Sequence, residues 1–316
     1  MMRMVLVWSV VLLAGFAALT LWRAAAREAA AEAAHPPAGH FVMVDGTRVH
    51  YIDTGPDNPD APAVVLIHGS SGNLNDWTFD IVGRLSDRYR VIAFDRPGLG
   101  YTDLVGRNAS AAEQARLLAD AARAIGAEAP IVVGHSYGGA IALAWALERP
   151  DALSGLVVLA GASNPWDTGI STYYQLLSHP VSGPVMAALI SAWVPDRVVS
   201  QSIAGTFAPQ SAPPGYAAHF GPGLTLRRFS LLENARQRAS LLPQIEAMVP
   251  RYSAIAVPTE IVHGDADTTV GLHVHSVPLS RQIPDARLTV LEGVGHMPQH
   301  ADPSALVDAI DRLAAR

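Results

Sequence analysis

The longest apolar run lies at the amino-terminal end of the chain. Residues 4–22 carry no charged side chain, and Arg3 and Arg23 bracket them. As a helix, such a run reaches about 28 Å, which matches the hydrocarbon core of a bilayer. We therefore predict a membrane anchor over residues 1–23, followed by a tether over residues 24–40. A chain that begins near Pro36 is expected to be soluble and equally active.

A cleaved signal peptide is the alternative interpretation of this run. Small residues that suit a cleavage site abound at 24–26 and 29–31. The apolar run is longer than the core of about 7–15 residues that signal peptides use, which favours the anchor. A very short charged tail seldom crosses a membrane, so we expect the remaining chain on the outer, periplasmic side. The signal-peptide alternative gives a secreted or periplasmic protein instead.

Beyond the tether, short apolar runs alternate with longer helical patterns. Residues 41–53 predict two short strands about an Asp45-Gly46 turn. Six buried-type runs follow, at 63–67, 90–94, 130–134, 155–160, 258–263 and 286–291. Helical patterns cover 109–125 and the end of the chain from Pro303. This alternation predicts an α/β fold, with a mostly parallel sheet and helices on both of its faces.

The alternation stops between residues 163 and 255. Proline and glycine interrupt this stretch, and an apolar helical piece covers 185–193. We expect a mainly helical insertion whose aromatic side chains serve packing more than substrate contact. These aromatic residues include Trp166, Tyr173, Tyr174, Trp193, Phe207, Tyr216 and Phe220.

Composition narrows the class of protein. Of 316 residues, 50% are hydrophobic and only 16% are charged, which excludes a disordered chain. The net charge is −6 and all 22 basic residues are arginine, with no basic stripe, so nucleic acid is not an expected partner. The chain has no cysteine, which excludes disulfides, a thiolate nucleophile and cysteine-bound zinc.

The strongest chemical pattern is Gly134-His135-Ser136-Tyr137-Gly138. It joins a β-branched apolar run to an Ala/Leu-rich helical segment. Glycines on both sides let the backbone fold back, so a strained serine can present its hydroxyl, and the helix that follows directs free N–H groups at the same point. The alternative is an ordinary glycine-rich turn with a solvent-exposed serine.

Further motifs accompany this one along the chain. They are His68-Gly69 after an apolar run, Asp95-Arg96-Pro97-Gly98-Leu99-Gly100, Gly264-Asp265-Ala266-Asp267, and Gly295-His296. With them, residues 41–316 resemble the α/β-hydrolase fold family. The resemblance implies an eight-stranded core over 41–162 and 256–316, with a helical cap over 163–255 that folds above the active site.

The resemblance also implies the roles of individual residues. Ser136 is the expected nucleophile, His296 the base and Asp267 the carboxylate that orients it, in the chain order known for this fold. The expected oxyanion donors are the backbone N–H groups of Ser70 and Tyr137. Asp265 is the alternative to Asp267, and His300 is the alternative to His296. Asp95 is interpreted as structural, bonding its own turn.

The expected function is ester hydrolysis by a serine hydrolase acting on a small, partly hydrophobic molecule. Cleavage of a carbon–carbon bond, or perhydrolysis without a cofactor, is the alternative on the same scaffold. Members of the family with aspartate at the elbow hydrolyse epoxides and haloalkanes, which Ser136 argues against. A membrane-anchored binding protein that has lost catalysis is an alternative of another class.

No cofactor and no metal are expected. The alternative is a metal site built from His273, His275, His296 and His300, although no motif such as His-Glu-x-x-His is present.

Overall fold

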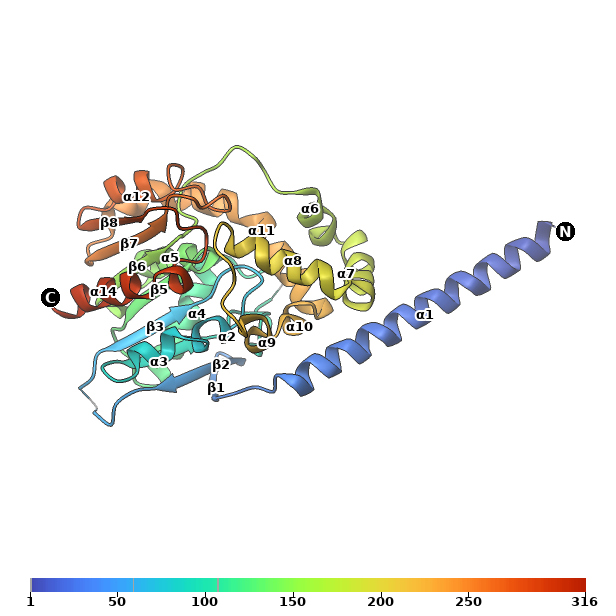
Figure 1. The fold of residues 1–316 in the computed structure, drawn as a ribbon, viewed down its shortest axis with the longest axis horizontal. Coiled ribbons are helices and arrows are strands. Elements are labelled where there is room, and N and C mark those ends of the chain that lie inside the picture. Colours follow the sequence, from blue (N-terminus) through green and yellow to red (C-terminus); the bar gives the residue numbers. More distant parts are fainter. Residues whose placement is uncertain (1, 59, 107) are drawn as a thin grey trace.

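A computed structural model describes residues 2–58, 60–106 and 108–316. Met1, which falls in the expected anchor, and Pro59 and Arg107, which fall in the expected core, lie outside the described residues. Figure 1 shows a rounded body from which one long helix projects.

The body is built on one eight-stranded sheet in the order β1-β2-β4-β3-β5-β6-β7-β8. β1 pairs antiparallel with β2, and β2 pairs antiparallel with β4, whereas all the other neighbours are parallel. This confirms the α/β fold with a mostly parallel sheet. The strands are β1 His40–Val44, β2 Thr47–Thr54, β3 Ala63–Ile67, β4 Arg90–Phe94, β5 Ile131–His135, β6 Gly155–Leu159, β7 Thr259–Gly264 and β8 Ala286–Leu291.

Helices cover both faces of the sheet because alternate side chains of each buried strand point to opposite faces. On β3, Val65 and Ile67 join a core with α4 (Ala111–Ala124) and α5 (Tyr137–Glu148). Val64 and Leu66 join a second core on the other face. That face is covered by α2 (Asn75–Thr78), α3 (Ile81–Leu85) and α14 (Pro303–Ala314). Two further helices flank the last strands, α12 (Ser276–Gln282) and α13 (Pro298–Ala301).

Local signals explain where individual elements begin. The side chains of Ser110 and Glu113 form a capping box at the start of α4. Asp45 and Gly46 both have positive φ, at 46° and 79°, and connect β1 to β2 as the predicted turn requires.

Between β6 and β7 the chain is mainly helical, and we call residues 163–255 the insertion. Its helices are α6 Thr172–Ser178, α7 Ser182–Trp193, α8 Asp196–Phe207, α9 Tyr216–Phe220, α10 Pro222–Thr225 and α11 Arg228–Met248, followed by a 3₁₀ turn over Val249–Ala254. Leu177, Ala187, Leu231 and Ala235 form a small core between α6, α7 and α11. The exact domain boundaries stay predictions.

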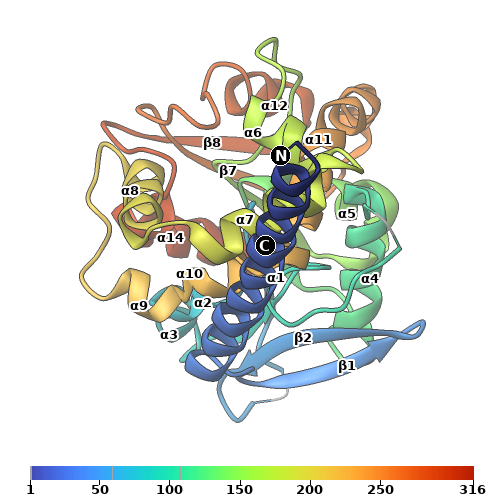
Figure 2. The ribbon, with the colours of Figure 1, turned by 90° about the vertical axis from the view of Figure 1, so that its right-hand side faces the viewer.

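The amino-terminal helix α1 runs without a break from Met2 to Ala34. It is long and apolar enough to cross a membrane. The expected tether differs from the structure, because residues 24–34 continue the same helix and pack on the insertion. Figure 2 shows α1 lying across α7. Alanine has the highest helix propensity, which is why this Ala/Glu/Arg segment stays helical beyond the apolar run.

Side chains of α1 complete the ends of two insertion helices. Arg23 Nε donates to the Ala192 carbonyl over 2.8 Å, and Arg27 Nη1 donates to the Val194 carbonyl over 2.9 Å, at the end of α7. The Glu28 carboxylate accepts bonds of 2.8 Å from the backbone N–H, Nε and Nη2 of Arg228, the first residue of α11. Helix ends have unpaired backbone groups that need such partners. The insertion and α1 therefore form one packed unit.

Candidate active site

Ser136 lies at a strained corner between β5 and α5. Its φ is +53° and its ψ is −116°, a conformation that a residue with a side chain rarely adopts. Two glycines make the corner possible. A Cβ on Gly134 would lie 2.1 Å from the Gly138 carbonyl oxygen, and a Cβ on Gly138 would lie 2.3 Å from that of Ile67. Only glycine therefore fits at either position.

The structure brings Ser136, His296 and Asp267 together from three separate segments. His296 Nε2 lies 2.9 Å from Ser136 Oγ, and His296 Nδ1 lies 2.7 Å from Asp267 Oδ2. With Nδ1 donating to the carboxylate, Nε2 is left to accept the serine proton. All three residues are buried. Ser136 is only 4% exposed and lines a cavity together with residues of the insertion, unlike the solvent-exposed serine of the alternative interpretation.

Asp267 is fixed in place by its own turn and by a second histidine. Its Oδ1 accepts the backbone N–H groups of Thr269 and Val270, over 2.7 and 2.9 Å. His263 Nε2 lies 3.2 Å from its Oδ2. Burial raises the pKa of the Asp267 carboxyl, but hydrogen bonds from His263 and His296 outweigh this and hold that pKa below its ordinary value. Asp267 is therefore ionised at neutral pH.

The alternative residues lie elsewhere. Asp265 accepts the Gly293 N–H over 2.7 Å, and His300 Nε2 lies 2.8 Å from Asp76 Oδ1. His275 Nδ1 accepts the N–H groups of Ser163 and Asn164, whereas His273 is exposed. Within the described ranges no group of three or more potential ligands could hold a metal, and the four histidines of the alternative metal site do not converge.

The expected oxyanion donors flank the serine. A Cβ on Gly69 would lie 3.1 Å from Ser136 Cβ, so the loop that carries Ser70 passes directly beside the corner. Among the described residues, the backbone N–H groups of Ser70 and Tyr137 bond to no protein atom. They are therefore free to bind a ligand oxygen.

The loop that carries Ser70 is tied to the insertion by one side chain. Asn234 Oδ1 of α11 accepts Ser70 Oγ over 2.8 Å and the Ser71 N–H over 2.7 Å. The position of this loop therefore depends on α11.

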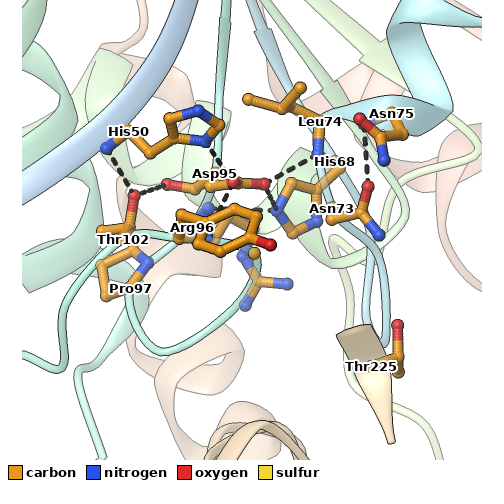
Figure 3. A network of polar contacts seen from close by, with 12 residues as sticks. His50, His68, Asn73, Leu74, Asn75, Asp95, Arg96, Pro97, Thr102 and Thr225 are labelled. Atoms are coloured by element: carbon orange, nitrogen blue, oxygen red, sulfur yellow. Dashed lines mark hydrogen bonds and ion pairs between the residues drawn. The ribbon is translucent and has the colours of Figure 1, made fainter. Parts of the chain in front are cut away.

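Asp95 lies at the centre of a network of polar contacts, as Figure 3 shows. Its carboxylate accepts the N–H of Leu74 over 2.8 Å and that of Tyr101 over 2.9 Å, and His50 Nδ1 lies 2.6 Å from it. The structural interpretation of Asp95 agrees with these contacts. They join its own turn to β2 and to the segment after β3.

The neighbouring Arg96 is fully buried and connects both sides of the expected oxyanion site. Its Nη1 donates to the Gly69 carbonyl over 2.9 Å, and its guanidinium lies 4.0 Å from the Tyr137 ring centre. It also donates to Gln114 of α4 and to Gln237 of α11. Burial lowers the pKa of Arg96 to about 10, so it remains charged at neutral pH.

A cavity of about 700 Å³ opens above Ser136 and His296. Most of its wall comes from apolar side chains of the insertion. Five of the nine aromatic residues of the insertion line it, namely Tyr173, Tyr174, Phe207, Tyr216 and Phe220. Trp193 packs on α1 instead, and Trp166 packs on His275. Such a cavity suits an apolar ligand.

A family model described as the alpha/beta hydrolase fold matches residues 62–303 of the chain. The chain belongs to the α/β hydrolase fold family.

Curated relatives of this α/β hydrolase include an uncharacterised protein of Mycobacterium tuberculosis. The two are 27% identical over 294 residues, which cover 88% of this chain and 81% of the relative. A protein named haloalkane dehalogenase 2, from the same organism, is 28% identical over 277 residues, covering 85% of this chain and 89% of the relative. Among solved structures, a membrane phospholipase A described as a bacterial virulence factor aligns with a TM-score of 0.70 and 22% identity, covering 100% of both chains.

Sequence reasoning missed several polar residues around the site of this α/β hydrolase. His135 Nε2 donates to the His296 carbonyl over 2.8 Å, and burial, followed by the charge of His296, lowers the pKa of His135 to about 4. Its place directly before Ser136 was the available signal. His263, Asn234 and Arg96 gave no comparable signal, since their partners are distant in sequence.

Asp76 was missed as well. It lines the cavity and accepts bonds from Tyr216 Oη over 2.7 Å and Gln299 Nε2 over 3.1 Å, besides its contact with His300. Burial raises the pKa of Asp76, but the hydrogen bond and charge of His300, the charge of His135 and the Tyr216 hydrogen bond together outweigh this and hold that pKa below its ordinary value. Asp76 therefore places a fixed negative charge in the cavity wall.

Proposed function

We propose that this α/β hydrolase is a serine hydrolase that cleaves a carboxylic ester of a partly hydrophobic molecule. The observation that carries the proposal is the continuous hydrogen-bond chain Ser136–His296–Asp267 at the floor of an apolar cavity. A strained serine, a histidine and a carboxylate in this order are the parts that nucleophilic acyl transfer requires.

In the proposed reaction, Ser136 Oγ attacks the ester carbon and passes its proton to His296 Nε2. Asp267 stabilises the imidazolium that forms. The negative oxygen of the tetrahedral intermediate accepts hydrogen bonds from the backbone N–H groups of Ser70 and Tyr137. The alcohol leaves with the proton from His296, and the acyl group stays on Ser136. Water, deprotonated by His296, then releases the acid.

Serine at position 136 favours acyl transfer over dehalogenation, although one relative is named a haloalkane dehalogenase. Displacing a halide from carbon calls for a carboxylate, whose alkyl ester water can then hydrolyse. A serine would form an ether, which His296 and water do not cleave. Carbon–carbon bond cleavage and perhydrolysis are the alternatives on the same scaffold. A relative named 2-hydroxy-6-oxononadienedioate/2-hydroxy-6-oxononatrienedioate hydrolase, from Burkholderia vietnamiensis, is 37% identical, but the match covers only 39% of this chain.

We further propose that α1 anchors the enzyme in a membrane, with the catalytic body on the outer side. The length and apolar surface of α1 support the anchor. Amino-terminal sequencing of the mature protein tests it: an intact Met1 is expected, and a start between Ala25 and His35 would show a cleaved signal peptide.

The experiment on function is a chain-length series of p-nitrophenyl esters with the full chain and with Ser136→Ala. The wild type should hydrolyse these esters, and the variant should lose about 10³-fold or more in kcat because only binding and the oxyanion donors remain. Circular dichroism should show the variant folded. Turnover by Ser136→Ala at the wild-type rate would refute the assignment.

A further inference from the structure

The last part of the apolar run of α1 packs on the body of the protein. Phe16 stacks on Trp193 of α7, with ring centres 6.0 Å apart and planes 8° from parallel. Trp193 Nε1 also donates to Thr20 Oγ1 over 3.1 Å. Both Phe16 and Thr20 belong to the uncharged run 4–22. When that run is in the bilayer, the end of α7 therefore stands at the level of the bilayer too.

The orientation of α1 on the insertion is fixed. The ion pair between Glu28 and Arg228 holds the helix to the start of α11, and the bonds from Arg23 and Arg27 hold it to the end of α7. Gly223 leaves room for this contact, since a Cβ there would lie 2.7 Å from that of Ala31. The same face of the insertion must therefore meet the membrane in every molecule.

The helices around this contact carry exposed apolar side chains, and three of them, Leu176, Val181 and Val185, line one open pocket. Val185 of α7 is 59% exposed, and Val181, which directly precedes α7, is 75% exposed. Leu176 of α6, Trp193 of α7 and Val198 of α8 are also exposed. Figures 1 and 2 show α7 against α1, with α6 and α8 beside it. We name these five residues the apolar face of the insertion.

The cavity above Ser136 opens on the same side. Four of its lining residues are themselves exposed, which places its mouth between α6 and α8. They are Tyr173, Val198, Ser202 and Thr206. Val198 belongs both to the mouth and to the apolar face. A molecule that enters the cavity therefore passes the surface that continues the apolar surface of α1.

We propose that the apolar face of the insertion rests in the bilayer beside α1 and that the cavity takes its substrate directly from the membrane. The substrate class is then an acyl ester of a membrane glycerolipid, whose acyl chain suits the apolar wall. Hydrolysis adds water across the ester and yields a fatty acid and the remaining alcohol. This inference rests on the proposed function of Ser136. The proposed occupant is lipid because the face lies beside a helix that is long and apolar enough to cross a membrane.

The first test compares two substrates with full-length enzyme in phosphatidylcholine vesicles. One is p-nitrophenyl butyrate, which is soluble, and the other is the phosphatidylcholine itself. Val185→Glu should slow release of fatty acid from the vesicle lipid about tenfold, because a carboxylate enters the interface at a high cost. It should leave p-nitrophenyl butyrate hydrolysis unchanged, since Val185 does not line the cavity above Ser136.

The matched control is Val290→Glu. Val290 is 46% exposed on β8, at the opposite end of the molecule from α1 in Figure 1. Val290→Glu should change neither the rate of lipid hydrolysis nor the rate of p-nitrophenyl butyrate hydrolysis. Unchanged lipid hydrolysis by Val185→Glu, or an equal loss on both substrates, would overturn the inference. No hydrolysis of p-nitrophenyl butyrate by the wild type would instead contradict the proposed function.

A second test does not depend on activity. Because the chain has no cysteine, Val185→Cys and Val290→Cys can each be labelled at one site with an environment-sensitive dye. In vesicles that contain brominated lipid, the dye at 185 should shift to the blue and be quenched at least about twofold relative to the dye at 290. Equal quenching at the two positions would overturn the membrane contact of this face.

Discussion

At the scale of single residues, the site depends on which carboxylate reaches His296. Two aspartates stand two positions apart at the end of β7, but only Asp267 contacts the histidine, whereas Asp265 bonds the Gly293 N–H. The Gly-x-x-Asp resemblance selected Asp267 from the sequence. The support from His263 could not be predicted, because a strand histidine four residues earlier has many other possible partners.

Asp267→Asn should therefore lower kcat by about 10³-fold or more, since the amide cannot hold the imidazole in the required tautomer or stabilise its charge. Asp265→Asn is the matched control and should cost less than about fivefold. Steady-state rates on a p-nitrophenyl ester decide between them. If Asp265→Asn were the inactive variant, the assignment of the carboxylate would be wrong.

At the scale of elements, the strands and the apolar amino-terminal helix were predicted well, and the tether that follows this helix was not. A parallel strand with both faces covered is a nearly continuous apolar run, so β3 and β4 begin and end as predicted. The edge strand β8 also begins and ends as predicted, although none of its residues is fully buried. The tether was misjudged because its partners lie far away in the sequence. Glu28 and Arg228 are 200 residues apart, and no local pattern links them.

The contacts of α1 also change the expectation for a chain that begins near Pro36. Such a chain would lose the side chains that complete α7 and α11 and would expose buried Arg227, which pairs with Glu32. We now expect it to have a loosened insertion rather than full activity.

Glu28→Ala tests this within the full chain. It removes the acceptor at the start of α11, and the loss should be about 1 kcal/mol, because Arg228 is partly exposed and solvent screens the ion pair. Limited proteolysis should cut faster within residues 163–255. Glu246→Ala, on the exposed side of α11, is the control and should behave as wild type. Identical cleavage of the three proteins would refute a supporting role for α1.

At the scale of the whole molecule, burial keeps several histidines neutral. It lowers the pKa values of His68, His135 and His275 to about 4. In the unfolded chain these three imidazoles bind protons near pH 6.5, whereas in the folded chain they bind protons only near pH 4. Acid therefore favours unfolding. Their contribution to stability is complete above about pH 6.5 and is lost as the pH falls toward 4.

The thermal unfolding midpoint of the full chain in detergent should therefore fall steadily between pH 6.5 and pH 4. Protonation of Asp76 and Asp267 adds to the loss only below their ordinary range, because their pKa values are depressed. A midpoint that stays constant from pH 6.5 to pH 4 would contradict the burial of these three imidazoles as neutral groups.

The central claim is that Ser136 carries the acyl group during turnover. Rapid acid quenching of the full-length enzyme with a p-nitrophenyl ester, followed by intact-mass measurement, tests it directly. The wild type should gain the mass of one acyl group, and peptide mapping should place that group on Ser136. Ser136→Ala should gain none. An acyl group found on another residue, or equally on the variant, would contradict the account.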